Sequence, residues 1–153
     1  MTTIAQASRV LAVPASDSHV AERHFRARLA LETDPSDVHA DLMAGIPGLV
    51  IVDVRSGAAY AQGHVPGAVH CPHVDIPTRA RVLIPAGATV VVYCWWPGCN
   101  GANRAGAAFA SLGIGVKEMI GGFEWWAREG LPVEDAAGTR RPDPDPLVAV
   151  VSA

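Results

Sequence analysis

The chain has 153 residues, of which 50% are hydrophobic and 18% are charged, and its formal net charge is −3. This length fits one domain with its own core, and the charge gives no general attraction to nucleic acid or to an anionic membrane. Three cysteines are too few for a disulfide scaffold and indicate a reducing compartment, so we expect a cytoplasmic protein. The apolar runs are short, and we expect neither a secretion signal nor a membrane span.

The first 32 residues are predicted to begin as an irregular arm and to continue as a helix and a strand. Residues 1–17 are weakly patterned and are expected to form an arm of low order. A short helix is expected over 18–24. The alternation of apolar with other residues from Phe25 to Glu32 predicts a half-exposed edge strand.

A helix and a buried strand follow. Asp34 and Pro35 are typical of a helix start, and that helix is expected to run to Ala44 and end at Gly45. The nearly unbroken apolar run at 49–54 predicts a central parallel strand. The later predictions, in chain order, are a helix at 56–62, a turn at 63–67, a strand at 68–71, a connection at 72–88 with at most a short helix, a strand at 89–93, a helix at 102–112, a strand at 116–120 and a helix at 123–129.

Alternation of strands and helices predicts an α/β fold: a single domain with a five-stranded, mostly parallel sheet and helices on both faces. The domain is expected over 18–135. The segment 136–153 contains Pro142, Pro144 and Pro146 and is expected to be an extended or mobile tail.

Cys94 stands directly after the predicted strand at 89–93 and before a helix of small residues. Ligands of such sheets gather at the carboxyl ends of the strands. Loop N–H groups and the positive end of a helix stabilise a thiolate there. Cys94 is therefore the candidate nucleophile, and a buried structural cysteine is the alternative.

Four segments of the chain resemble the rhodanese family of sulfurtransferase domains, in family order and with family-like spacing across about residues 27–134. They are Val52-Asp53-Val54-Arg55, Gly63-His64-Val65-Pro66-Gly67-Ala68, Val92-Tyr93-Cys94 with the following loop and helix to Leu112-Gly113, and Gly121-Gly122-Phe123-Glu124-Trp125-Trp126 with Gly130-Leu131-Pro132-Val133.

The resemblance implies transfer of a sulfane sulfur without a cofactor. Cys94 would take sulfur from a small donor such as thiosulfate, a persulfide or a polysulfide and become a persulfide. The acceptor would be cyanide, a small thiol or the thiol of a partner protein. Sulfur and anion binding is assigned to the loop residues Trp95, Trp96, Pro97, Gly98, Cys99, Asn100 and Gly101, in which the tryptophans and the proline exclude water and the glycines let N–H groups turn inward.

The loop departs from many thiosulfate-using members because it carries no charge from Trp95 to Asn100. This argues against thiosulfate as the natural donor. Arg104 on the following helix is a candidate substrate contact, with a solvated helical arginine as the alternative. Phosphatase relatives place an arginine six residues after the cysteine, where this chain has Asn100, so a phosphoryl role is disfavoured.

Cys99 admits three interpretations: a resolving thiol, the sulfur carrier itself, or an inert second thiol. The cluster His70-Cys71-Pro72-His73 is not predicted to bind a metal, because alternating strand residues point to opposite faces. Structural roles are expected for Asp53, Arg55 and His64. Trp126 is expected in the core and Trp125 facing elsewhere.

A sulfurtransferase acting through Cys94 is the leading hypothesis. A catalytically silent domain of the same family that binds a partner is the second hypothesis. A Cys94/Cys99 dithiol that cycles through a disulfide is the third.

Overall fold

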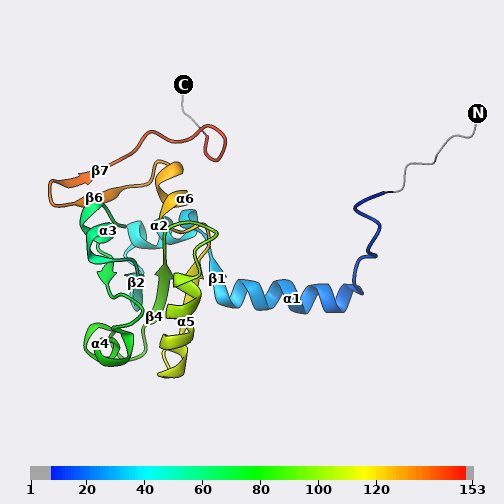
Figure 1. Cartoon of the computed structure of the whole chain (residues 1–153), viewed down its shortest axis with the longest axis horizontal. Helices are drawn as coiled ribbons and strands as arrows, with labels where there is room; N and C mark the ends of the chain where they lie inside the picture. The colour runs from blue at the N-terminus through cyan, green and yellow to red at the C-terminus, as the bar shows by residue number, and fades with distance from the viewer. Residues whose placement is uncertain (1–7, 151–153) are drawn as a thin grey trace, which may run out of the picture. The chain divides into compact units, whose positions relative to one another are not determined.

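A computed structural model describes residues 8–150, and the chain divides into two compact units, 1–30 and 31–153 (Figure 1). The first seven residues of the arm expected at 1–17 lie outside the described residues. Within 8–150, no helix is long and apolar enough to cross a membrane.

The helix α1 spans Ser18–Leu31, which corrects the prediction of a helix at 18–24 followed by a strand from Phe25. The segment is rich in alanine, leucine, arginine and glutamate, which all favour helix, and Glu22 pairs with Arg26 one turn later at 2.8 Å. No residue of α1 is buried. The alternation of apolar and polar residues from Phe25 therefore does not mark a strand with one buried face.

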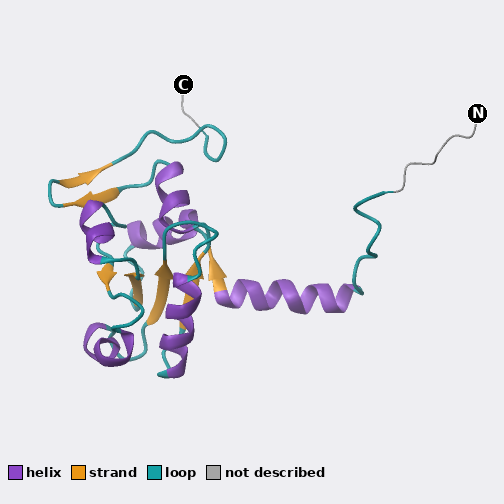
Figure 2. Ribbon diagram, viewed as in Figure 1, coloured by secondary structure: helices purple, strands orange, loops and turns teal. Residues whose placement is uncertain are grey.

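A five-stranded parallel sheet forms the centre of the second unit, as predicted (Figure 2). Its strands lie in the order β1-β5-β4-β2-β3. Their bounds are β1 Glu32–Thr33, β2 Leu49–Asp53, β3 Val69–His70, β4 Thr89–Tyr93 and β5 Val116–Met119. The edge strand β1 therefore starts where the expected strand was to end, and the two central strands match their predictions closely.

Helices cover both faces of this sheet, because successive residues of a strand point to opposite sides. Val90 and Val92 share one buried cluster with Phe109, whereas Val91 shares the other with Trp126. The first cluster is covered by α4 (Ile76–Leu83) and α5 (Gly101–Ser111), and the second by α2 (Pro35–Ala44) and α6 (Gly122–Arg128). The remaining helix is α3, Gly57–Gln62.

The ends of α2 follow the chemistry expected from the sequence. The Asp34 side chain accepts a hydrogen bond from the Asp37 N–H at 2.8 Å. Gly45 adopts a left-handed conformation with φ of 62°, in which its N–H reaches the last carbonyls of the helix. These two caps set where α2 begins and ends.

The segment after α6 differs from the expected extended or mobile tail. The strands β6 (Val133–Asp135) and β7 (Gly138–Arg140) form an antiparallel hairpin, which spans the expected boundary at 135/136. Further on, the Asp145 N–H donates to the Arg128 carbonyl at 2.7 Å, and the two side chains pair at 3.0 Å. The tail is thus held against the end of α6.

A buried ion pair lies at the carboxyl end of β2. The side chains of Asp53 and Arg55 are fully buried, and Arg55 Nη2 donates to Asp53 Oδ2 at 2.6 Å and to the Gly63 carbonyl at 2.6 Å. The Tyr93 hydroxyl donates to Asp53 Oδ2 at 2.7 Å and accepts from the Val65 N–H at 3.1 Å. Removing one partner of such a pair typically costs about 3–5 kcal/mol. The pair joins β2 and β4 to the turn after α3.

The substitution Tyr93→Phe tests this buried arrangement. It leaves the Val65 N–H without its acceptor and takes one donor from Asp53, which keeps those of Arg55, so we expect the free energy of unfolding to fall by about 1–3 kcal/mol in urea denaturation. Tyr60→Phe is the matched control, since its partly buried hydroxyl gives one hydrogen bond to the Ala68 carbonyl at 2.9 Å. Equal losses in the two variants would contradict the importance of the buried hydroxyl.

Candidate active site

Cys94 follows β4 directly and is 7% exposed. It lies at the carboxyl edge of the sheet, in the middle of the strand order, as predicted from the sequence. Its side chain joins the buried cluster beneath α5. The loop from Trp95 to Asn100 then leads into α5, whose first residue is Gly101.

The start of α6 fixes the orientation of the first loop peptides. The Phe123 N–H donates to the Cys94 carbonyl at 2.9 Å, and the Glu124 N–H donates to the Trp95 carbonyl at 2.8 Å. In a planar trans peptide the C=O and the following N–H point in opposite directions. The carbonyl of Cys94 therefore faces α6 while the Trp95 N–H faces the loop, where it hydrogen-bonds the sulfurs of Cys94 and Cys99.

Gly122 permits this approach. A Cβ at this position would lie 2.8 Å from the Cys94 carbonyl oxygen and 3.1 Å from the Trp95 carbonyl oxygen, and its φ is 63°. Only glycine fits both the contact and the conformation. The double glycine is visible in the sequence as part of a family motif, whereas the role of the Phe123 and Glu124 amides in the site is not.

A tight turn brings the second cysteine back to the first. The Cys99 N–H donates to the Trp96 carbonyl at 2.9 Å, with Pro97 and Gly98 at the two central positions. Proline presets the backbone for the first central position of such a turn. The Cys99 side chain is partly exposed, whereas Cys94 is buried.

Gly101 lies against both sulfurs. A Cβ on Gly101 would stand 2.6 Å from Cys94 Sγ and 3.5 Å from Cys99 Sγ. The Gly101 N–H also hydrogen-bonds the Cys99 sulfur. The inward-turned amides expected from the sequence are thus those of Trp95 and Gly101, and more of their hydrogen bonds reach Cys99 than Cys94.

The two thiols differ in how readily they ionise. Burial, and then the hydrogen bond to Cys99, raise the pKa of Cys94 from 9.0 to about 12. Burial also opposes ionisation of Cys99. However, the hydrogen bonds from Cys94, Gly101 and Trp95 together lower the pKa of Cys99 below its usual 9.0. Of the two thiols, Cys99 is therefore the one that loses its proton first as the pH rises.

Arg55 packs against the loop through the ring of Trp95. Its guanidinium carbon lies 4.5 Å from the Trp95 ring centroid and 4.1 Å from that of Phe123, so a cation is held between the loop and α6. Its Nη1 atom is buried without a hydrogen-bond partner in the described part of the chain. Because Asp53 neutralises this cation, it adds no free positive charge at the cysteines.

The outer loop residues cover the sulfurs less than the sequence suggested. Trp95 is partly buried and packs against the core beneath α5. Trp96, in contrast, is 50% exposed, and Pro97, Gly98 and Asn100 are exposed. Of the tryptophans and the proline expected to exclude water, only Trp95 is partly buried.

Arg104 is exposed on the first turns of α5, where its N–H closes a helical turn on the Asn100 carbonyl at 3.1 Å. No described interaction joins its side chain to the two sulfurs. Its contact with substrate remains a prediction.

The histidines near the site make structural contacts. His64 Nδ1 lies 2.9 Å from the Tyr60 carbonyl oxygen, and the two rings stack at 3.7 Å, so the expected bond from ring to backbone is present. His70 Nε2 lies 2.9 Å from the Arg55 carbonyl oxygen. Cys71 is fully buried, and burial raises its pKa. Among residues 8–150, no group of three His, Cys, Asp or Glu side chains is placed to hold a metal ion.

A groove of about 340 Å³ adjoins the loop. Its lining residues are Asp34, Pro35, Pro97, Ile120, Gly121, Trp125 and Glu129. Trp125 thus faces away from the core, whereas Trp126 is fully buried and donates to the Pro132 carbonyl at 2.7 Å, as expected for both. The two carboxylates make this groove acidic, and burial followed by repulsion from Asp34 raises the pKa of Glu129.

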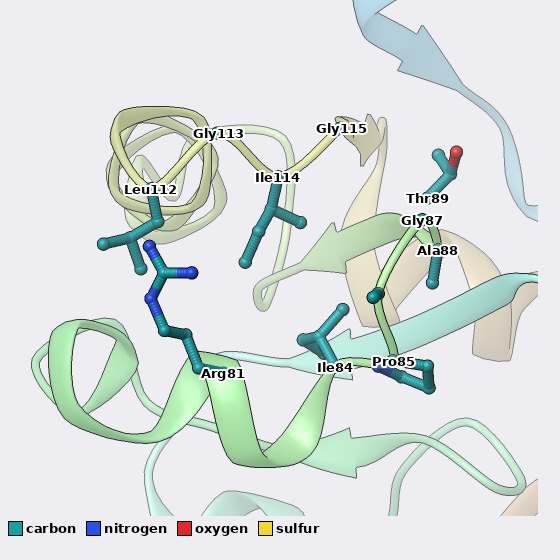
Figure 3. A pocket seen from close by; sticks show the side chains of 11 residues that line it. Arg81, Ile84, Pro85, Gly87, Ala88, Thr89, Leu112, Gly113, Ile114 and Gly115 are labelled. Atoms are coloured by element: carbon teal, nitrogen blue, oxygen red, sulfur yellow. The ribbon is translucent and has the colours of Figure 1, made fainter.

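A second pocket, of about 380 Å³, lies at the amino-terminal ends of the strands, away from the cysteines (Figure 3). It lies beside Thr89, where β4 begins, and beside Gly115, just before β5. Arg81 supplies its one ionisable side chain. The reactive groups and this pocket are therefore separated by the length of β4.

Comparison with known proteins agrees with this arrangement. The family model of the rhodanese-like domain matches residues 35–129. The thiosulfate sulfurtransferase GlpE of Pseudomonas fluorescens (strain SBW25) is 37% identical over 92 residues, which are 60% of this chain and 81% of that protein. A sulfurtransferase of Allochromatium vinosum is 37% identical over 94 residues, covering 60% and 83%.

Solved structures show the same fold. The crystal structure of the BH2092 protein from Bacillus halodurans aligns with a TM-score of 0.75 and 39% identity, over 80% of this chain and 89% of that one. Together with the family match over more than half of the chain, this shows that the protein belongs to the rhodanese-like domain family.

Proposed function

We propose that the protein is a sulfurtransferase that carries a sulfane sulfur as a persulfide on Cys94. Relatives named sulfurtransferase, at 37% identity, support a sulfurtransferase-type function. The observation that carries the proposal is a thiol at the carboxyl end of β4 beside a backbone N–H that α6 aims at it. Such a donor stabilises an anionic sulfur without a metal or a cofactor.

The reaction begins with a proton transfer within the pair. The Cys94 thiol is hydrogen-bonded to Cys99, whose pKa is lowered, so Cys99 is the base that takes the proton of Cys94 as the donor molecule enters. The Cys94 thiolate then attacks the outer sulfur of the donor, and the bond from that sulfur to the rest of the donor breaks. The remainder of the donor leaves with the electron pair, and Cys94 becomes a persulfide.

The acceptor completes the cycle. A nucleophile such as cyanide or a thiol attacks the outer sulfur of the persulfide, and the S–S bond breaks so that its electron pair returns to Cys94. The acidic groove that Pro97 lines is the surface we propose this acceptor meets beside the loop. It favours neutral or cationic acceptors over dianions.

The lack of a free positive charge in the loop indicates which kind of sulfur donor the site suits. The loop carries no basic side chain, and Arg55, which packs against the Trp95 ring, is neutralised by Asp53. Thiosulfate, a dianion, therefore lacks a charged partner in the loop. We propose a persulfide or polysulfide, small or carried by a protein, as the better donor.

Intact mass spectrometry tests the proposal. The protein is incubated with polysulfide, freed of excess donor, and measured at once, before and after cyanide. We expect the wild type to gain the mass of one sulfur atom and to lose it to cyanide. Cys94→Ser should gain none, whereas Cys99→Ser should gain it more slowly, because Cys94 has lost its proton acceptor.

Two results would reject this function. Absence of an adduct with every donor would favour the catalytically silent, partner-binding domain. An adduct that persists in Cys94→Ser and vanishes in Cys99→Ser would move the carrier role to Cys99.

A glycine substitution tests the geometry of the pair. Gly101→Ala places a Cβ 2.6 Å from Cys94 Sγ, so we expect the rate of cyanide-dependent sulfur transfer to fall on the order of 100-fold, as for a reacting atom displaced by about 1 Å. Gly106→Ala is the control in the same helix, since nothing lies within 4 Å of its added Cβ. If both variants keep wild-type rates, the close contact between Gly101 and the sulfurs is unimportant for transfer.

A further inference from the structure

The second cysteine is placed to react with the product of the first. The turn from Trp96 to Cys99 returns Cys99 to the carboxyl end of β4. Both sulfurs then lie around one point beside Gly101, at 2.6 and 3.5 Å from the position of a Cβ there. An intramolecular thiol at such a site acts at an effective concentration that no solution thiol reaches.

The surroundings of the two sulfurs suit different tasks. Cys94 is buried at the end of β4, whereas Cys99 is partly exposed in the loop that precedes α5. The amides of Trp95 and Gly101 both hydrogen-bond the Cys99 sulfur, so Cys99 becomes a thiolate readily. A thiolate is the form that attacks a disulfide or a persulfide.

We infer that Cys99 resolves the Cys94 persulfide, so that the protein releases hydrosulfide and ends as a Cys94–Cys99 disulfide. The inference rests on the proposed persulfide and assigns it a second outcome besides transfer. It requires no acceptor molecule in the site.

The step balances in atoms and electrons. Cys99 Sγ attacks Cys94 Sγ, the bond between Cys94 Sγ and the outer sulfur breaks, and the outer sulfur leaves with the electron pair. It takes the proton of Cys99 and departs as hydrosulfide. The sulfane sulfur is thereby reduced and the two thiols are oxidised to a disulfide. An external thiol reductant, such as a dithiol, is then needed to restore the pair.

The third cysteine gives a matched control. Cys71 is fully buried beside β3, and its pKa is raised by burial. It lies in the buried cluster that also holds Cys94, and its described hydrogen bond goes to the neighbouring Pro72 carbonyl and not to the loop. Cys71→Ala removes one thiol from the chain and leaves the Cys94/Cys99 pair unchanged.

The experiment follows a protein loaded with polysulfide, in the absence of oxygen and of added thiol. After removal of excess donor, hydrosulfide and intact mass are recorded over time for the wild type, Cys71→Ala, Cys99→Ser and Cys99→Ala. In the wild type and in Cys71→Ala we expect the added sulfur to disappear, hydrosulfide to appear in equal amount, and the final mass to be two hydrogens below that of the reduced protein. In both Cys99 variants the adduct should persist, with hydrosulfide release slower on the order of 100-fold or more.

The outcomes separate the two proposals. A wild-type adduct that persists as long as that of Cys99→Ser, with no loss of two hydrogens, would overturn the resolving role and leave the Cys94 persulfide intact. Failure of both Cys99 variants to take up any sulfur would instead reject the Cys94 persulfide itself. Peptide mapping that joins Cys99 to Cys71 would also overturn the inference.

Discussion

The site depends on one backbone hydrogen bond, from the Phe123 N–H to the Cys94 carbonyl at 2.9 Å. This bond turns the peptide after Cys94 so that the Trp95 N–H faces the sulfurs. It forms because Gly122 lets α6 begin against the loop, where any side chain would meet the Cys94 carbonyl at 2.8 Å. A segment nearly thirty residues away in the chain thus sets the electrostatics of the thiols.

A buried charge pair holds the other side of the same loop. Arg55 lies between the rings of Trp95 and Phe123, and its charge is balanced by Asp53 at 2.6 Å. The pair stabilises the contact between loop and helix without attracting an anionic donor. Stabilisation of an anionic sulfur is therefore left to N–H groups, which suits a donor that is not a small dianion.

The sequence predicted the elements that carry strong local signals. The capping residues Asp34 and Gly45 fix the limits of α2, and the apolar run at 49–54 corresponds to a central strand. Cys94 could be placed at a strand end for the same reason. The segment from Phe25 was predicted wrongly because its short alternation was given more weight than its helix-forming composition. The hairpin at 133–140 was missed because a proline-rich composition says little about pairing.

The sequence could not predict which of the two thiols, Cys94 or Cys99, ionises first. The order depends on the Trp95 and Gly101 amides, whose directions follow from tertiary contacts. From sequence alone Cys99 remained open between a resolving, carrying or inert thiol. The structure distinguishes the two sulfurs by burial and by hydrogen bonds, and so gives each a separate step in the proposed chemistry.

The most direct test of this account is the ionisation of the two thiols in the intact reduced protein. NMR of protein labelled with ¹³C at the cysteine Cβ, assigned with the single variants, follows both thiols through a pH titration. We predict that Cys99 ionises with a pKa below its usual 9.0 and that Cys94 ionises with a pKa of about 12. Ionisation of Cys94 before Cys99 would contradict it.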